Sequence, residues 1–187
     1  MLLSIIIPIL TENKYFKDLI ESLPSKIKSN YELIVLDWPE SVNEKWNKWV
    51  KKAKWDYIFV LNDDIVLTEW IDLELIKVLE TNKVACPFST VGRYKFNLPL
   101  RKANKDNIVG WCFMMERKNW VPIDERLKIW YWDNWIYETQ LKDIWYAWLV
   151  HHYESQTLKT LDVKKILNRD KLYWNIICDE KWWNINF

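Results

Sequence analysis

Two adjacent carboxylates follow an apolar run at residues 57–61, in the sequence Asn62-Asp63-Asp64. Neighbouring carboxylates near a buried strand repel each other and resist desolvation unless a positive charge neutralises them. Mg²⁺ or Mn²⁺ commonly fills this role, bound through protein oxygens while substrate phosphates complete the coordination. The pattern indicates a metal site at Asp63 and Asp64, with Asn62 beside it. The alternative is a solvated turn in which Asp64 caps the following helix.

The two histidines of the chain are neighbours, His151 and His152, and they follow an apolar run at residues 145–150. Imidazole is a good ligand for transition metals and a good partner for phosphate. Either histidine could complete a site begun by the carboxylates. The alternative is a structural histidine whose ring nitrogens are satisfied within the fold.

A single carboxylate, Asp133, stands among aromatic residues in the segment Trp130-Tyr131-Trp132-Asp133-Asn134-Trp135. Burial among aromatic rings raises the pKa of a carboxyl group toward the working range of a general base. Exposed aromatic faces also stack on sugar rings, and the candidates for this are Trp111, Trp130, Trp132 and Trp135. The alternative is a core stripe in which Asp133 only caps a helix.

The elements that must position these residues alternate along the first half of the chain. Near-continuous apolar runs predict strands at residues 2–10, 32–37, 57–61 and 83–88. Helical periodicity lies between them, beginning near Tyr15 and ending at Pro24, then at residues 42–53 behind a Ser41 cap, then at 70–81. This alternation predicts an α/β fold with a mainly parallel sheet covered by helices on both faces. Ligands bind beyond the carboxyl ends of such strands, where Asp37 and Asp64 fall.

The second half has a different pattern. We expect a polar, basic loop at residues 89–107, which could close over phosphates with Arg93, Lys95, Arg101, Lys102 and Lys105. A strand at 108–116, a turn at 124–126, a helix at 133–142 and a strand at 145–150 should follow. The periodicity predicts a further helix from Leu158, and the end from residue 173 to 187 is rich in aromatic residues.

Composition excludes several classes of protein. Only two of 187 residues are glycine, so a P-loop and a dinucleotide-binding fingerprint are both absent. The formal net charge of +1 favours neither nucleic acid nor anionic lipid as a partner. The three cysteines are too far apart for a zinc motif, and we expect idle thiols. No run predicts a signal peptide or a transmembrane segment, so a cytoplasmic protein is expected.

Taken in order, these segments resemble a family 2 glycosyltransferase of the GT-A type over residues 3–157. The motifs that carry the resemblance are Ser4-Ile5-Ile6-Ile7-Pro8, Tyr31-Glu32-Leu33-Ile34-Val35-Leu36-Asp37, Leu61-Asn62-Asp63-Asp64, Gly110 to Arg117 with Asp124-Glu125-Arg126, Trp132-Asp133-Asn134 and His152-Tyr153-Glu154-Ser155-Gln156-Thr157. No single motif is specific, whereas six in this order are.

The resemblance implies a role for each site residue. Pro8 and Asp37 would line the nucleotide of the donor, together with Asn62 and Asp63. Asp64, with Asp63 and either His151 or His152, would hold Mn²⁺ or Mg²⁺ against the diphosphate. Asp133 would deprotonate the acceptor hydroxyl.

The implied activity is an inverting transfer of a sugar from a nucleotide-diphosphate sugar to a glycan, lipid or protein acceptor. The expected organisation is one GT-A domain over residues 1–187. It comprises a nucleotide-binding half (1–88), an acceptor and catalytic half (106–157) and a C-terminal helical, aromatic tail (158–187), which is a candidate oligomer interface. Processive synthases carry Q-x-x-R-W and membrane helices, and both motifs are missing here. A chain this compact resembles virus-encoded members of the family.

Some residues depart from the family pattern and leave alternatives open. Asn62 replaces the first acid of D-x-D, and Asn134 replaces the second acid of the usual base segment. Asp124 and Glu125 are therefore alternative candidates for the base. One rival is a sugar nucleotidyltransferase, although the glycine-rich loop of that class is absent. Another is a non-catalytic carbohydrate-binding or interaction protein on the same scaffold.

Overall fold

The computed structural model describes residues 2–9, 12–37, 41–89, 100–104, 110–153 and 163–181. The strands within these ranges are β1 (Leu2–Ile9), β2 (Asn30–Asp37), β3 (Tyr57–Leu61), β4 (Ile65–Val66), β5 (Val84–Ser89), β6 (Arg101–Lys102), β7 (Cys112–Glu116) and β8 (Ile144–His152). The helices are α1 (Lys14–Lys26), α2 (Val42–Lys52), α3 (Ile71–Leu79), α4 (Trp132–Thr139) and α6 (Val163–Lys181), with a 3₁₀ turn at Arg117–Asn119.

Within the described ranges, the strands form one mixed sheet in the order β2-β1-β3-β7-β5-β8-β4, and β6 pairs with β8. Strands β2, β1, β3, β5 and β8 run in one direction, whereas β7, β4 and β6 run against them. The prediction of a mainly parallel α/β sheet is therefore confirmed. The reversed β7 enters between β3 and β5, so its amino end lies beside the carboxyl end of β3, with Cys112 opposite Leu61.

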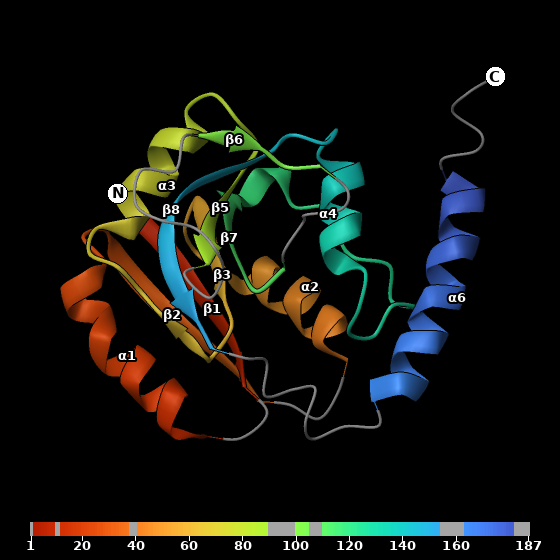
Figure 1. Ribbon diagram of the computed structural model, residues 1–187, viewed down its shortest axis with the longest axis horizontal. Coiled ribbons are helices and arrows are strands. Elements are labelled where there is room, and N and C mark those ends of the chain that lie inside the picture. Colours follow the sequence, from red (N-terminus) through yellow and green to blue (C-terminus); the bar gives the residue numbers. More distant parts are fainter. Residues whose placement is uncertain are drawn as a thin grey trace.

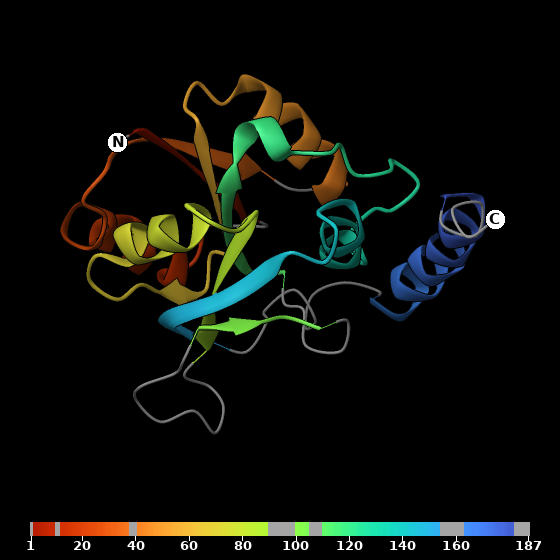
Figure 2. The ribbon, with the colours of Figure 1, turned by 90° about the horizontal axis from the view of Figure 1, so that it is seen from above.

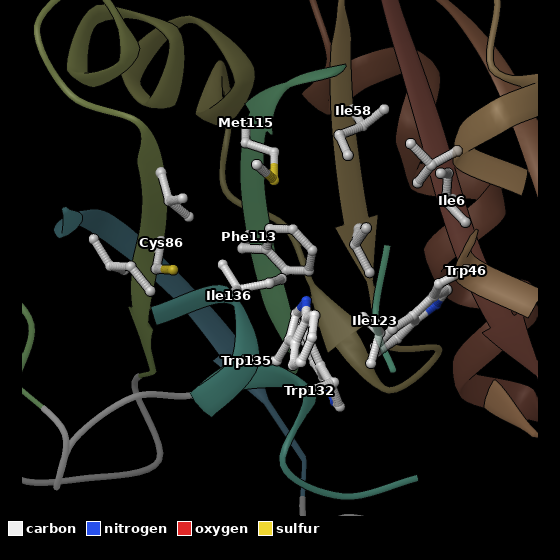
Figure 3. Packing of buried hydrophobic residues seen from close by; sticks show 14 of the residues in the cluster. Ile6, Trp46, Ile58, Cys86, Phe113, Met115, Ile123, Trp132, Trp135 and Ile136 are labelled. Atoms are coloured by element: carbon white, nitrogen blue, oxygen red, sulfur yellow. The ribbon is translucent and has the colours of Figure 1, made fainter. Parts of the chain in front are cut away.

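Helices cover both faces of this sheet, as Figures 1 and 2 show. Successive side chains of a strand point to opposite faces, so each central strand supplies two cores. Ile5 and Phe59 pack in the cluster that includes residues of α1 and α3. Ile6 and Ile58 pack in the other cluster, under α2 and α4, and Figure 3 shows this second core. The apolar runs of β1 and β3 are continuous because both faces are buried.

Caps explain two helix starts, and one predicted helix end is wrong. Asn13 accepts a hydrogen bond from the Phe16 N–H at 3.0 Å and begins α1. Ser41 caps α2 as predicted, accepting from the Glu44 N–H at 3.3 Å. Pro24 does not end α1, which continues to Lys26. The proline removes one donor, but the Ile27 N–H still bonds to Leu23 O at 2.9 Å, so the last turn is kept.

The predicted basic loop at residues 89–107 is described only at 89 and 100–104, where it is partly wrong. Arg101 and Lys102 form β6 and pair with Tyr146 and Trp145 of β8. Ala103 is buried in the core, which anchors this short strand. Arg93, Lys95 and Lys105 lie outside the described residues. The residues that the structure describes contain no helix long and apolar enough to cross a membrane.

Candidate functional site

The acidic turn lies where β3 ends at the carboxyl edge of the sheet. The Asn62 N–H donates to the carbonyl of Trp111 at 2.8 Å, which ties the turn to the residue preceding β7. Asp63 Oδ2 accepts a hydrogen bond from Asn13 Nδ2 at 2.9 Å. Asp64 is 2% exposed, and its carbonyl accepts from the Tyr153 N–H at 3.0 Å. The turn is thus held by three distant segments and is not a loose solvated loop.

His152 is the histidine that reaches the acidic turn. It lies opposite Ile65 where β8 pairs with β4, and its Nε2 is 3.2 Å from Asp64 Oδ1. Both atoms are buried, and neither has a hydrogen-bond partner within the part of the chain that the structure describes. They therefore contact each other, and no third group among the described residues bonds to either atom. A cation bound beside them would satisfy both atoms.

His151 does not join this contact. Neighbouring side chains on a strand point to opposite faces, so only one histidine of the pair can face Asp64. The His151 ring instead meets the Tyr153 ring edge-on, with centroids 4.6 Å apart. The His152 ring stacks on Trp111, with centroids 4.7 Å apart and planes 16° from parallel. Trp111 therefore forms a wall that fixes the plane of the His152 imidazole.

The donor atoms at this turn suit a divalent cation that takes its remaining ligands from water and substrate. Asp64 and His152 supply an oxygen and a nitrogen, and both atoms lack other partners. No cluster of three or more His, Cys, Asp or Glu side chains suited to a metal occurs among the described residues. Mg²⁺ commonly takes one or two protein carboxylates and completes its shell with water and substrate phosphates. Burial raises the pKa of Asp63, while the hydrogen bond from Asn13 opposes this shift.

Asp133 occupies the first turn of α4. Its Oδ1 accepts a hydrogen bond from the Asn134 N–H at 2.9 Å. Burial raises the pKa of Asp133 from its ordinary 3.8 to about 6, which confirms the expectation from its aromatic surroundings. Asp133 also adds to the effect of burial in raising the pKa of the Cys86 thiol in β5. The start of α4 thus faces the sheet.

Two of the four tryptophans expected to stack on a sugar are core residues. Trp132 and Trp135 are 8% and 2% exposed, and Figure 3 shows both in the packed cluster. The Trp132 ring meets Trp46 of α2 edge-on, with centroids 4.2 Å apart. The prediction of a sugar platform is therefore wrong for Trp132 and Trp135. Both rings belong to the core that lies under α4.

The acidic turn and Asp133 share one edge of the sheet. The link is residues 110–111: Trp111 binds the Asn62 N–H through its carbonyl, and Gly110 lies against the ring of Trp132. Residues 110–111 therefore contact both the acidic turn, at the carboxyl end of β3, and the start of the helix that carries Asp133.

No family model and no curated protein matches this sequence. Several solved structures are similar to this chain. A197 from STIV is 14% identical, with 83% of this chain and 87% of that chain covered and a TM-score of 0.59. S. aureus TarS 1–349 in complex with UDP-GlcNAc is 14% identical over 95% of this chain and 67% of that one, with a TM-score of 0.65.

A third similar structure is glucosyl-3-phosphoglycerate synthase from Mycobacterium tuberculosis in complex with Mn²⁺, UDP and phosphoglyceric acid. It is 11% identical over 89% of this chain and 76% of that one, with a TM-score of 0.61. These neighbours share the GT-A architecture. The chain has the GT-A fold. It spans 35% of one S. aureus TarS chain and 58% of TarS 1–349 in complex with UDP.

The GT-A fold places the two remaining predicted nucleotide residues at the same edge. Pro8 lies opposite Leu36, and Ile9 lies opposite Asp37, where β1 and β2 end together. β1 also pairs in parallel with β3, so these ends lie next to the strand that leads to the acidic turn. Only the backbone of Asp37 is described, and its side chain lies outside the described part.

The alternative bases are less suited to proton transfer. Asp124 accepts hydrogen bonds from Arg126 Nε at 2.9 Å and Nη2 at 2.8 Å. These bonds with Arg126 lower the pKa of Asp124. Asp124 therefore binds a proton less readily, whereas Asp133 binds one more readily. Glu125 is exposed. Of Asp133 and Asp124, Asp133 is the one whose pKa is raised.

The C-terminal tail of this GT-A chain packs on the chain itself where it is described. Trp174 of α6 stacks on Tyr131, with centroids 5.7 Å apart, and Ile177 is fully buried. Figures 1 and 2 both show α6 beside α4. Tyr173 and Trp174 pack against the core, so these two rings give no support to the predicted oligomer interface. Residues 182–187 lie outside the described part.

Sequence reasoning missed two residues of the site's support. Asn13 binds Asp63, and its signal was the asparagine that precedes an amphipathic helix. Asp170 of α6 is fully buried and binds the backbone before α4. Nothing in the local sequence distinguishes this aspartate from a solvated helical one.

Proposed function

We propose that this chain is an inverting glycosyltransferase that uses a nucleotide-diphosphate sugar as donor. The observation that carries the proposal is the pairing of two unlike groups at one edge of a GT-A sheet. One is the buried Asp64–His152 contact, to which no third described group bonds. The other is Asp133, whose raised pKa suits a general base.

The donor proposed is a UDP-linked sugar. The similar TarS structures contain UDP and UDP-GlcNAc, and the similar mycobacterial synthase contains UDP with Mn²⁺ or Mg²⁺. In this chain Pro8 and Asp37 would line the nucleotide, with Asn62 and Asp63 at its phosphates. Asp64 and His152 would hold Mn²⁺ or Mg²⁺, with Asp63 close by. A metal bound there would supply positive charge that stabilises the diphosphate as it leaves.

The proposed role of Asp133 is to accept one proton. Its carboxylate would take the proton of the acceptor hydroxyl as that oxygen forms a bond to the anomeric carbon. The bond from the anomeric carbon to the diphosphate oxygen breaks on the opposite side, and the electron pair leaves with the nucleoside diphosphate. Because attack and departure are on opposite faces, the configuration of the sugar is inverted. The rings of Trp132 and Trp135 would limit water near the base.

The acceptor proposed is a glycan, lipid or protein hydroxyl, with no role for nucleic acid. The cytoplasmic location, the resemblance to virus-encoded members and the division into halves at 1–88 and 106–157 remain predictions. Arg101 and Lys102 are exposed on β6. They are the described part of the basic segment proposed to cover the donor phosphates.

Turnover tests the proposal directly. Purified chain would be mixed with Mn²⁺, a panel of UDP-sugars and simple glycan acceptors, and the release of UDP would be measured. Asp133→Asn should reduce the turnover number by about 10²-fold or more, the range for a lost general base. Asp124→Asn is the matched control and should retain turnover. The anomeric proton coupling of the product should report inversion.

Two results would contradict the proposal. Release of pyrophosphate from a nucleoside triphosphate and a sugar phosphate would favour the nucleotidyltransferase. Sugar binding without turnover from any donor, unchanged by Asp133→Asn, would favour the non-catalytic carbohydrate-binding protein.

A further inference from the structure

Asp170 is a fully buried carboxylate in the middle of α6. An ionised carboxylate away from water is costly unless hydrogen bonds replace its hydration. Backbone N–H groups do so here. Asp170 Oδ2 accepts from the N–H of Ile129 at 2.8 Å and of Trp130 at 2.9 Å, and the Lys128 N–H reaches both oxygens at 3.1 and 3.2 Å. Three consecutive backbone donors thus converge on one side chain from a distant helix.

These donors directly precede the element that carries the proposed base. Tyr131 follows Trp130, and α4 begins at Trp132, so two residues separate the Asp170 contact from Asp133. Tyr131 has a φ of 63°, in the left-handed region, and no side chain caps the helix at this position. A non-glycine residue is strained in that region by about 1–2 kcal/mol and stays there only where its surroundings impose it.

Other contacts from α6 hold the same segment. Trp174 stacks on the strained Tyr131, one turn along the helix from Asp170. Glu180 accepts from Arg126 Nη1 at 3.1 Å and Nη2 at 2.8 Å, and Arg169 Nη2 donates to the Arg126 carbonyl at 3.3 Å. The segment from 126 to 131 is therefore attached to α6 at several points. Among these α6 side chains, Asp170 is the most buried, and the stack of Trp174 on Tyr131 lies nearest to α4.

We propose that Asp170 is a positioning residue for Asp133. Its carboxylate holds the 128–130 backbone in the course that forces Tyr131 into its left-handed conformation and starts α4 with Asp133 against the sheet. The inference rests on the proposed function, because it concerns the placement of the proposed base. It assigns the C-terminal helix to the active site as a support, although α6 supplies no group to the chemistry.

Two measurements on Asp170→Asn test this inference. The amide keeps one acceptor oxygen and places an NH₂ group against backbone donors, so amide hydrogen exchange at 128–130 should accelerate. The turnover number should fall about 10-fold or more, because a shift of the order of 1 Å in a catalytic group can reduce rate up to 10²-fold. The KM for the UDP-sugar should change less than about two-fold, because the acidic turn is not touched. Asp179→Asn, exposed on the same helix, is the matched control.

The outcomes separate the inference from a purely structural role and from failure of the proposed function. Faster exchange at 128–130 with full turnover below the melting temperature would overturn the inference, and so would unchanged exchange. If Asp170→Asn does not fold, Asp170→Glu keeps the carboxylate and is measured in the same way, with an intermediate loss of turnover expected. If the unsubstituted chain transfers no sugar, the proposed function fails and Asp170 has no base to position. If the parent chain transfers sugar and Asp170→Asn loses turnover while Asp179→Asn keeps it, the result supports both the inference and the proposed function.

Discussion

Gly110 lies against the indole ring of Trp132 so closely that a methyl group at Gly110 would be 2.1 Å from Cζ2 of that ring. Real Cβ atoms do not approach other heavy atoms so closely, so any other residue at this position must displace the ring. Gly110 leads into β7, and Trp132 begins α4. One missing side chain therefore sets the distance between the sheet edge and the helix that carries Asp133.

Gly110→Ala should destabilise the fold by about 1–3 kcal/mol, the usual effect of an extra methyl group in a packed site. Chemical denaturation measures this difference. The control is a double-mutant cycle with Trp132→Leu, which removes the ring atoms that the methyl group meets. In the Trp132→Leu background the effect of Gly110→Ala should largely disappear. An equal penalty in both backgrounds would show that the ring is not the cause.

Asp133 should make stability depend on pH. Its pKa is about 6 in the folded chain against an ordinary 3.8, so the unfolded chain loses this proton first. The free energy of unfolding should therefore fall by roughly 2–3 kcal/mol as the pH rises from about 4 to about 6. Above about pH 6 it should level off. Asp133→Asn mimics the neutral acid and should remove this fall, which leaves the variant more stable than the parent at pH 8. Equal stability of the two at pH 8 would contradict the burial of this group.

The same group should shape the rate of sugar transfer. A general base works when deprotonated, so turnover should rise with pH through about 6 and reach a plateau above it. A pH–rate profile of the unsubstituted enzyme measures this limb. Stability and turnover would then change in opposite directions over one pH range. A rate that is flat between pH 5 and 8 would assign proton transfer to another group.

Asp124 should show the opposite pH dependence of stability. Hydrogen bonds and charge from Arg126 lower the pKa of Asp124 below its ordinary 3.8, so its stabilisation is present at neutral pH and lost on acidification. Asp124→Asn should therefore lose about 1 kcal/mol at pH 7, a small effect because the Arg126 side chain is 34% exposed. The difference from the parent should shrink as the pH falls below the ordinary pKa of 3.8. Denaturation curves at pH 7 and pH 3 would check both values, and a penalty as large at pH 3 as at pH 7 would exclude the ion pair as its source.

The acidic turn should make nucleotide binding depend on metal. UDP at about 100 times its dissociation constant adds about 2.7 kcal/mol of stability, and Mn²⁺ should tighten this binding. Asp64→Asn and His152→Ala should each lose the Mn²⁺-dependent part of the thermal shift. His151→Ala is the matched control and should keep it, because His151 faces away from Asp64. A loss in His151→Ala alone would reverse the assignment of the two histidines.

The sequence by itself determined four strands and three helices of the first half, but not β4, and the edge where the candidate site lies. The apolar runs of β1 and β3 are continuous because both faces are buried, and that composition is visible without a structure. Asp63 and Asp64 follow the end of β3, and ligand sites in parallel sheets lie at that edge. The aromatic residues beside Asp133 in the chain predicted its burial, and burial is what raises its pKa.

Only the tertiary structure decided how distant segments meet. The reversed direction of β7 and the pairing of β6 with β8 depend on hydrogen bonds between separate strands, and β6 is too short to carry a pattern. His152 was distinguished from His151 by the register of β8 against β4, since a shift of one residue exchanges the two faces. Trp132 became a core residue through its contact with Gly110, and Asp170 became a support through three backbone groups some forty positions away. Local patterns specify which elements form, whereas contacts between distant residues are set when those elements pack.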